Sequence, residues 1–132
     1  MRHLVIGDIH GAYKALQQCW DRSKFNKKED HLIVLGDVCH GWRFVSKSID
    51  ALLSVKNCDY VIGNHDRWVI RWVEQGFKEK IWLDQGGKST IASYPMGIPA
   101  AHLAFLKKAH PYYIFENKLF VHGGIDPTQP IE

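Results

Sequence analysis

Short runs of apolar residues alternate along this chain with polar segments that begin at glycine. Continuous apolar runs of this length are typical of strands buried on both faces, so residues 4–6, 32–35 and 60–62 are predicted to form strands. The polar segments that follow them are, in chain order, Gly7-Asp8-Ile9-His10-Gly11, Gly36-Asp37-Val38-Cys39-His40-Gly41 and Gly63-Asn64-His65-Asp66. If the strands are parallel, all three segments meet at one edge of the sheet, outside the carboxyl ends of its strands.

Apolar residues spaced by three and four positions predict helices between these strands. This spacing covers residues 12–20 and 45–53. A further helix is predicted to begin near Asp66, whose carboxylate can cap free backbone N–H groups, and to run towards Gly76. The order strand, loop, helix therefore repeats, which indicates an α/β fold.

The second half of the chain predicts a helix and a hairpin. Pro99 is expected to open a helix that ends before Pro111. Residues 112–115 and 118–121 flank a two-residue turn and are expected to pair as a hairpin. A fourth glycine-containing segment, Val121-His122-Gly123-Gly124, follows this second run.

Between these parts lie aromatic residues and a glycine pair. Helical spacing explains Trp68 and Trp72, so we expect these residues, Phe77 and Trp82 to belong to the core. Gly86-Gly87 is predicted to form a turn and the start of a helix, because the full spacing of a phosphate-binding loop is missing.

Composition limits the functional classes. A chain of 132 residues with 45% hydrophobic content can bury one ordinary core, so we expect a single domain over 1–132. The formal charge of +3 is small and the basic residues are scattered, which argues against a nucleic-acid groove. Three cysteines without a C-x-x-C pair favour a reducing compartment, and no segment approaches the roughly 20 apolar residues of a membrane span. A cytoplasmic protein without a membrane or nucleic-acid partner is the expectation.

The polar segments carry carboxylate, imidazole and amide groups, a ligand set that suits Mn²⁺ or iron, with zinc as an alternative. In an extended stretch Asp8 and His10 point the same way while Ile9 turns to the core. A single Gly-Asp pair is more often a turn than a ligand. Several such loops in order favour a metal site. Cys39 beside His40 does not predict a tetrahedral zinc site, which uses two spaced ligand pairs.

The order and spelling of the four segments resemble the calcineurin-like metallophosphoesterases, most closely their phosphoprotein phosphatase branch. That family carries GDxHG, GDxxDRG, GNH followed by Asp or Glu, VHGG or VHAG, and a last histidine nearer the C-terminus. The first, third and fourth motifs match well and the second matches in part, whereas the last histidine does not occur before Glu132. The resemblance implies a β-sandwich flanked by helices, of which this chain would hold the N-terminal portion and be incomplete at its C-terminus.

The resemblance also implies how the segments are used. Asp8 and His10 would bind the first of two divalent metal ions, Asp37 would bridge the pair, and Asn64 and His122 would hold the second. Mn²⁺ is the expected metal, with Fe or Zn as alternatives. A metal pair would activate water for attack on a phosphoryl group.

Two departures from the family pattern affect the remaining roles. His65 matches the general acid, but His40 stands where the family has the aspartate that orients it. Losing a carboxylate about 4 Å away removes an attraction of about 4 kcal/mol at an effective dielectric of 20, so we expect His65 to be a weaker proton carrier. Gly41 stands where a phosphate-binding arginine is expected, which leaves Arg43 and Arg67 as candidates for substrate binding.

The function predicted from these residues is a phosphomonoester hydrolase, most like a protein serine/threonine phosphatase because the fourth segment is spelled VHGG. The alternatives are a symmetrical dinucleoside tetraphosphatase and a catalytically impaired metal-binding fragment. The expected partner is a phosphorylated protein or a small phosphoester. An incomplete sheet would expose an edge, which favours self-association.

Overall fold

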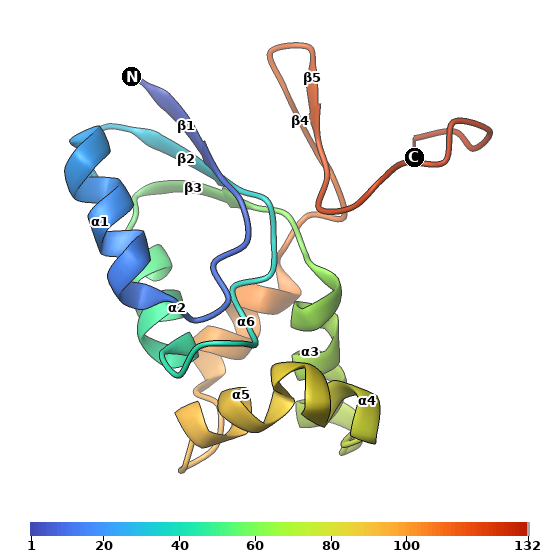
Figure 1. The fold of residues 1–132 in the computed structure, drawn as a ribbon. Coiled ribbons are helices and arrows are strands. Elements are labelled where there is room, and N and C mark those ends of the chain that lie inside the picture. Colours follow the sequence, from blue (N-terminus) through green and yellow to red (C-terminus); the bar gives the residue numbers. More distant parts are fainter. Residues whose placement is uncertain (132) are drawn as a thin grey trace.

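A parallel sheet of three strands, in the order β1-β2-β3, forms the centre of the computed structural model, which describes residues 1–131 (Figure 1). The strands are β1 (His3–Ile6), β2 (His31–Val34) and β3 (Asn57–Tyr60). Ile6 is opposite Val34, and Val34 is opposite Tyr60. Their carboxyl ends therefore align, and the loops that follow all leave the sheet at one edge.

The third strand lies earlier than the apolar run predicts. It covers Asn57–Tyr60 rather than 60–62, because a polar residue inside it is satisfied by hydrogen bonds. Asp59 Oδ2 is 2.8 Å from His31 Nε2, and Asp59 Oδ1 is 3.1 Å from His110 Nε2. A search for apolar runs cannot detect a strand whose polar residues pair in this way.

Helices follow each of the three site loops. They are α1 (Tyr13–Ser23), α2 (Val45–Leu53) and α3 (Asn64–Gln75). α3 ends at Gly76, whose φ of 68° lies in the left-handed region that glycine tolerates. α6 (Ala100–Lys107) follows Pro99 and packs against α2 and α3. The expected strand, loop and helix order is confirmed.

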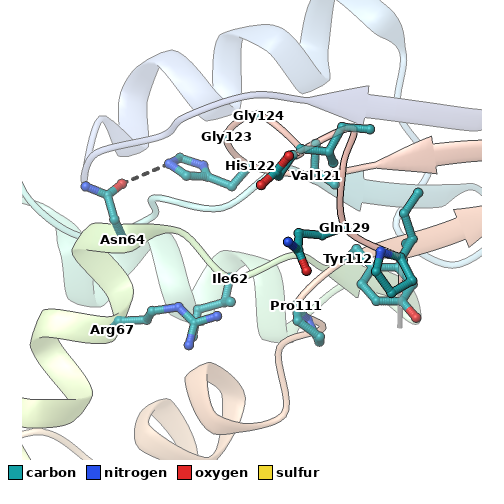
Figure 2. Close-up of a pocket in the computed structure, with 14 residues that line it drawn as sticks. Ile62, Asn64, Arg67, Pro111, Tyr112, Val121, His122, Gly123, Gly124 and Gln129 are labelled. Atoms are coloured by element: carbon teal, nitrogen blue, oxygen red, sulfur yellow. Dashed lines mark hydrogen bonds between the residues drawn. The ribbon is translucent and has the colours of Figure 1, made fainter.

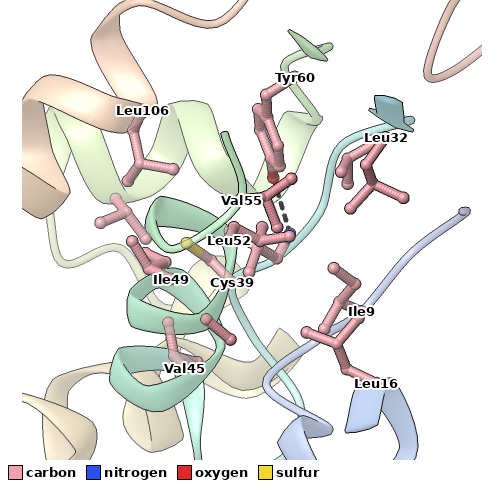
Figure 3. Close-up of a cluster of buried hydrophobic side chains, with 14 of the residues drawn as sticks. Ile9, Leu16, Leu32, Cys39, Val45, Ile49, Leu52, Val55, Tyr60 and Leu106 are labelled. Atoms are coloured by element: carbon pink, nitrogen blue, oxygen red, sulfur yellow. Dashed lines mark hydrogen bonds between the residues drawn. The ribbon is translucent and has the colours of Figure 1, made fainter. Parts of the chain in front are cut away.

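The core lies between the sheet and these helices. Figure 3 shows Leu16 of α1, Ile49 and Leu52 of α2, Leu32 of β2 and Leu106 of α6 meeting in one cluster, each at most 2% exposed. Burying a side chain of this size contributes about 1.5–3 kcal/mol. Each helix is thereby fixed relative to the strand before it, which fixes the loop between them.

The hairpin consists of β4 (Tyr113–Phe115) and β5 (Lys118–Phe120). Both residues of its turn, Glu116 and Asn117, have positive φ, as a two-residue hairpin requires. The hairpin is a separate two-stranded sheet and lies on the face of the main sheet opposite the helices, where Phe115 contacts His3 at 4.6 Å between ring centroids. In the described part of the chain, the expected β-sandwich is thus represented by a three-stranded sheet and one hairpin.

A kinked segment lies beside α3, as Figure 1 shows. It consists of α4 (Lys80–Trp82), the turn η1 (Leu83–Gly87) and α5 (Lys88–Ser93). Gly86 has a φ of 107° and marks the kink, so the predicted turn and helix start are confirmed. Across residues 1–131, no helix combines the length and the apolar character that crossing a bilayer requires.

Candidate metal centre

The five predicted metal ligands lie together at the carboxyl edge of the sheet. His10 Nε2 is 3.4 Å from Asp8 Oδ2 and 3.9 Å from Asp37 Oδ2. His122 Nε2 is 3.2 Å from Asp37 Oδ2 and 3.0 Å from Asn64 Oδ1. Asp37 Oδ2 is therefore common to two adjacent groups of potential ligands.

Backbone carbonyls orient the two imidazole rings. His10 Nδ1 is 2.9 Å from Cys39 O, and His122 Nδ1 is 2.7 Å from Leu35 O. A carbonyl can only accept, so each Nδ1 carries a hydrogen, and in the neutral form of each ring Nε2 offers a lone pair towards Asp37. Lone pairs that face one another without a hydrogen between them repel, and a cation between them removes the repulsion. The donor set therefore fits a pair of divalent cations.

Because Asp37 is buried, its ionisation depends on positive charges close to its carboxylate. Asp37 is 2% exposed, and burial raises its pKa, while the charges of His122 and His10 and the backbone N–H of His65 act in the opposite direction. One ligand atom from each of Asp8, Asp37 and His122 lies within 4.8 Å of the others. A cation at this position would favour the ionised form of the buried carboxylate.

Two glycines allow the loops to approach this closely. Gly36 has a φ of 91°, and a Cβ there would lie 2.9 Å from His122 Nδ1. A Cβ on Gly63 would lie 1.9 Å from Asp37 Oδ1. Gly7 has neither a left-handed backbone nor an atom within 4 Å of such a Cβ, so the first loop does not need its glycine for this reason.

The first segment departs from the extended geometry that the sequence indicates. Ile9 is buried at 5% exposure and Asp8 and His10 do point to the same place, as expected. His10, however, has a φ of 49°, so its backbone turns to the left-handed region instead of remaining extended. The backbone N–H groups of Ile9 and His10 both donate to Asp37 O, at 3.1 and 2.8 Å, and this pairing with the second loop sets the turn.

A buried carboxylate that the sequence indicates only as a helix cap connects the second and third loops. Asp66 is fully buried in the first turn of α3. Its Oδ2 accepts hydrogen bonds from the N–H of Asp37 and of Gly63, both at 2.9 Å, and from the Tyr60 hydroxyl at 2.6 Å. Its Oδ1 accepts from the N–H of Cys39 at 3.2 Å. Burial raises the pKa of Asp66, and the hydrogen bonds from Tyr60 and Gly63 oppose that rise.

The family model of the calcineurin-like phosphoesterases matches residues 1–131. The chain belongs to this family.

Curated relatives of this calcineurin-like phosphoesterase are named symmetrical bis(5'-nucleosyl)-tetraphosphatases. That of Psychromonas ingrahamii is 27% identical over the whole chain, which covers 47% of the relative. That of Haemophilus ducreyi is 30% identical, and the match covers 96% of this chain and 46% of the relative. The chain thus spans about half the length of these relatives.

Solved structures share the fold. One whose name suggests a diadenosine tetraphosphatase superposes with a TM-score of 0.78 at 20% identity, and the match covers 98% of this chain and 53% of the other. A metallophosphoesterase from Sphaerobacter thermophilus gives a TM-score of 0.60 at 24% identity, with 87% and 43% covered. The expected metallophosphoesterase fold is confirmed. The expected phosphoprotein phosphatase branch is not supported, because the curated relatives carry the name of the alternative.

In this family member, His65 lies at the start of α3 and contacts His40. His65 Nδ1 is 2.8 Å from His40 Nδ1, and its backbone N–H donates to Asp37 Oδ1 at 3.1 Å. Burial lowers the pKa of His65, and the charge of His10 lowers it further. Burial, followed by the charges of His65 and His10, lowers the pKa of His40 to about 3. His40 is therefore a neutral ring at ordinary pH.

The two candidate arginines lie in different places. Arg67 lines a pocket of about 380 Å³ together with Asn64 and His122, and Figure 2 shows Tyr112 on the other side of this pocket. The volume is within the ~300–1,000 Å³ typical of small-molecule sites. Arg43 lies outside this pocket and borders a separate apolar depression. The geometry therefore favours Arg67 over Arg43 as a substrate contact.

Proposed function

We propose that this chain contributes the dinuclear metal centre of a phosphoric ester hydrolase that acts on dinucleoside polyphosphates. The observation that carries the proposal is the pair of ligand groups that share Asp37 Oδ2, each with an imidazole lone pair turned towards it. Two divalent cations held there, Mn²⁺ with Fe or Zn as alternatives, would lower the pKa of a bound water and neutralise charge on the phosphoryl group.

The protein groups around this centre have separate tasks in the proposal. Asp8 and His10 hold one side, Asn64 and His122 hold the other, and Asp37 serves both. His65 supplies the ring nearest to these ligands that is not itself one of them, since its centroid is 5.3 Å from that of His10. We therefore assign His65 to the leaving phosphate oxygen, to which it would donate a hydrogen as the phosphoanhydride bond breaks.

The pocket beside the centre supports a nucleotide as the substrate. It begins at Asn64 and His122, so a phosphoryl group at the metal ligands would place the rest of the substrate in it. Arg67 offers a guanidinium for a second phosphate and Tyr112 offers an aromatic face for a base. The named activity of the curated relatives agrees with this substrate class.

A cytoplasmic location is part of the proposal. Cys19, Cys39 and Cys58 are free in the described chain, which suits a reducing compartment.

The test compares three substrates with the metal-loaded chain: diadenosine tetraphosphate, a phosphopeptide and p-nitrophenyl phosphate, each with Mn²⁺. We expect diadenosine tetraphosphate to be cleaved fastest, with ADP as the product, and metal analysis to give two ions per chain. Asp37→Asn should lower both the metal content and the rate, because it removes the shared carboxylate oxygen. Faster cleavage of the phosphopeptide would overturn the substrate class. Bound metal without turnover of any substrate would indicate the impaired metal-binding fragment instead.

A further inference from the structure

Behind His65, two more rings form a hydrogen-bonded chain that leads away from the metal ligands. The indole N–H of Trp82 donates to His40 Nε2, and His40 Nδ1 is 2.8 Å from His65 Nδ1. The ring centroids of Trp82 and His40 are 5.6 Å apart, and those of His40 and His65 are 4.7 Å apart. Trp82 and His40 are both 0% exposed, so water does not compete for these hydrogen bonds.

The indole N–H of Trp82 determines which group donates and which accepts in both hydrogen bonds. An indole N–H can only donate, so His40 Nε2 accepts and carries no hydrogen. A neutral imidazole has one N–H, which in His40 must then lie on Nδ1 and point at His65 Nδ1. His65 Nδ1 is consequently an acceptor, and the hydrogen of a neutral His65 lies on Nε2.

The glycine pair Gly86-Gly87 and the following helix hold these rings in place. A Cβ on Gly87 would lie 2.7 Å from the Trp82 ring, and a Cβ on Gly86 would lie 2.8 Å from His40 Cβ. The backbone N–H of His40 donates to Thr90 Oγ1 at 3.2 Å. Because both positions lack a side chain, the turn can pack directly against Trp82 and His40.

We propose that Trp82 is a positioning residue that acts through His40 to hold His65 as the tautomer with its hydrogen on Nε2. Nε2 is the ring nitrogen of His65 that His40 leaves free. A carboxylate at position 40 would have the opposite effect, because it accepts from His65 Nδ1 and favours the charged ring. With the Trp82 and His40 pair, His65 presents an N–H donor without having to carry a charge. The inference adds to the proposed role of His65 at the leaving oxygen and rests on it for its functional meaning.

The tautomers can be measured directly by ¹⁵N NMR of the histidine side chains, in the metal-free chain at mildly alkaline pH. Signals are assigned from His65→Gln and His40→Asn, which each remove one set. We expect His65 Nδ1 and His40 Nε2 to show the shifts of unprotonated ring nitrogens. Trp82→Phe keeps an aromatic ring but removes the N–H, so His40 and His65 should then each populate both tautomers. Trp72→Phe is the matched control. The ring centroid of Trp72 is 5.8 Å from that of Trp82, but Trp72 is not one of the three hydrogen-bonded rings, so this substitution should leave both tautomer patterns unchanged.

Two results would overturn the inference: a protonated Nδ1 on neutral His65 in the wild-type chain, or unchanged tautomers in Trp82→Phe. If Trp82→Phe does not fold, the wild-type spectrum alone decides. The measurement uses neither metal nor substrate, so it can succeed even if the proposed hydrolase activity is wrong. If that activity is present, Trp82→Phe should lower kcat by about tenfold or more with KM unchanged, since it disturbs a proton donor and no binding contact.

Discussion

Asp66→Asn tests whether the buried carboxylate holds the second and third loops together. The substitution keeps the shape of the side chain but replaces one acceptor oxygen by an NH₂ group. Four donors converge on the carboxylate: the Tyr60 hydroxyl and the N–H groups of Asp37, Cys39 and Gly63. An amide cannot accept from all of them, so at least one buried N–H or O–H must face another donor.

The expected loss follows from the number and kind of these hydrogen bonds. Each hydrogen bond to a charged group contributes about 1.5–3 kcal/mol, and breaking one side of a buried charged network costs about 3–5 kcal/mol. We therefore expect Asp66→Asn to lower the free energy of unfolding by about 3–5 kcal/mol. Tyr60→Phe removes a hydroxyl that donates to Asp66 and accepts from the Val38 N–H at 2.9 Å, and should cost about 1–3 kcal/mol.

Urea unfolding of the metal-free chain measures these losses without any contribution from bound metal. Because Asp66 and Tyr60 share one hydrogen bond, the double variant should lose less than the sum of the two single losses. Asp21→Asn is the matched control: the residue is exposed on α1, and the change should stay within about 0.5 kcal/mol. A loss below about 1 kcal/mol for Asp66→Asn would show that the carboxylate does not hold the loops.

Three further predictions concern the metal ligands and the histidine pair. Gly63→Ala should weaken Mn²⁺ binding at least tenfold by calorimetry, since the new Cβ must displace Asp37, whereas Gly7→Ala should bind as the wild type does; equal weakening in both would contradict the steric argument. His40→Asp should raise turnover by favouring the charged form of His65, and identical rates across pH would refute this. The folded pKa of His40, about 3, lies below the ordinary value of 6.5. The unfolded chain therefore binds this proton more readily, so the stability that the neutral ring contributes is complete above pH 6.5 and is lost as pH falls towards 3, by at most about 1.4 kcal/mol per pH unit. Unfolding midpoints of His40→Asn should change less across that range than those of the wild type.

The apolar runs and glycine-led segments predict the sheet edge and the meeting of the five candidate side chains there, because both depend on local sequence. The rest depends on contacts between distant segments. Asp59 makes a polar stretch compatible with β3 only through His31 and His110. Trp82 reaches His40 across a separation of 42 residues, which no local pattern reveals. The choice between Arg43 and Arg67 likewise needed the position of the pocket.

The expectation of a phosphoprotein phosphatase branch rested on the spelling of one segment, VHGG. Such a spelling describes the backbone near a ligand and carries no information about the group attached to the phosphate. The curated relatives carry the name of the alternative, and their similarity extends over the whole chain rather than over one motif.

The two sides of the centre are expected to form at different times, because His122 follows the hairpin and lies far along the sequence from the loop that it contacts. Contacts between His10 and the second loop close a separation of 29 residues, whereas His122 reaches Leu35 across 87. Contacts between segments that are far apart in sequence form more slowly. During synthesis, His10 and the second loop also leave the ribosome well before His122 does. If the centre is as proposed, nascent chains would pass through a stage at which Asp8, His10 and Asp37 hold a single ion, and metal uptake during refolding should occur in two kinetic phases.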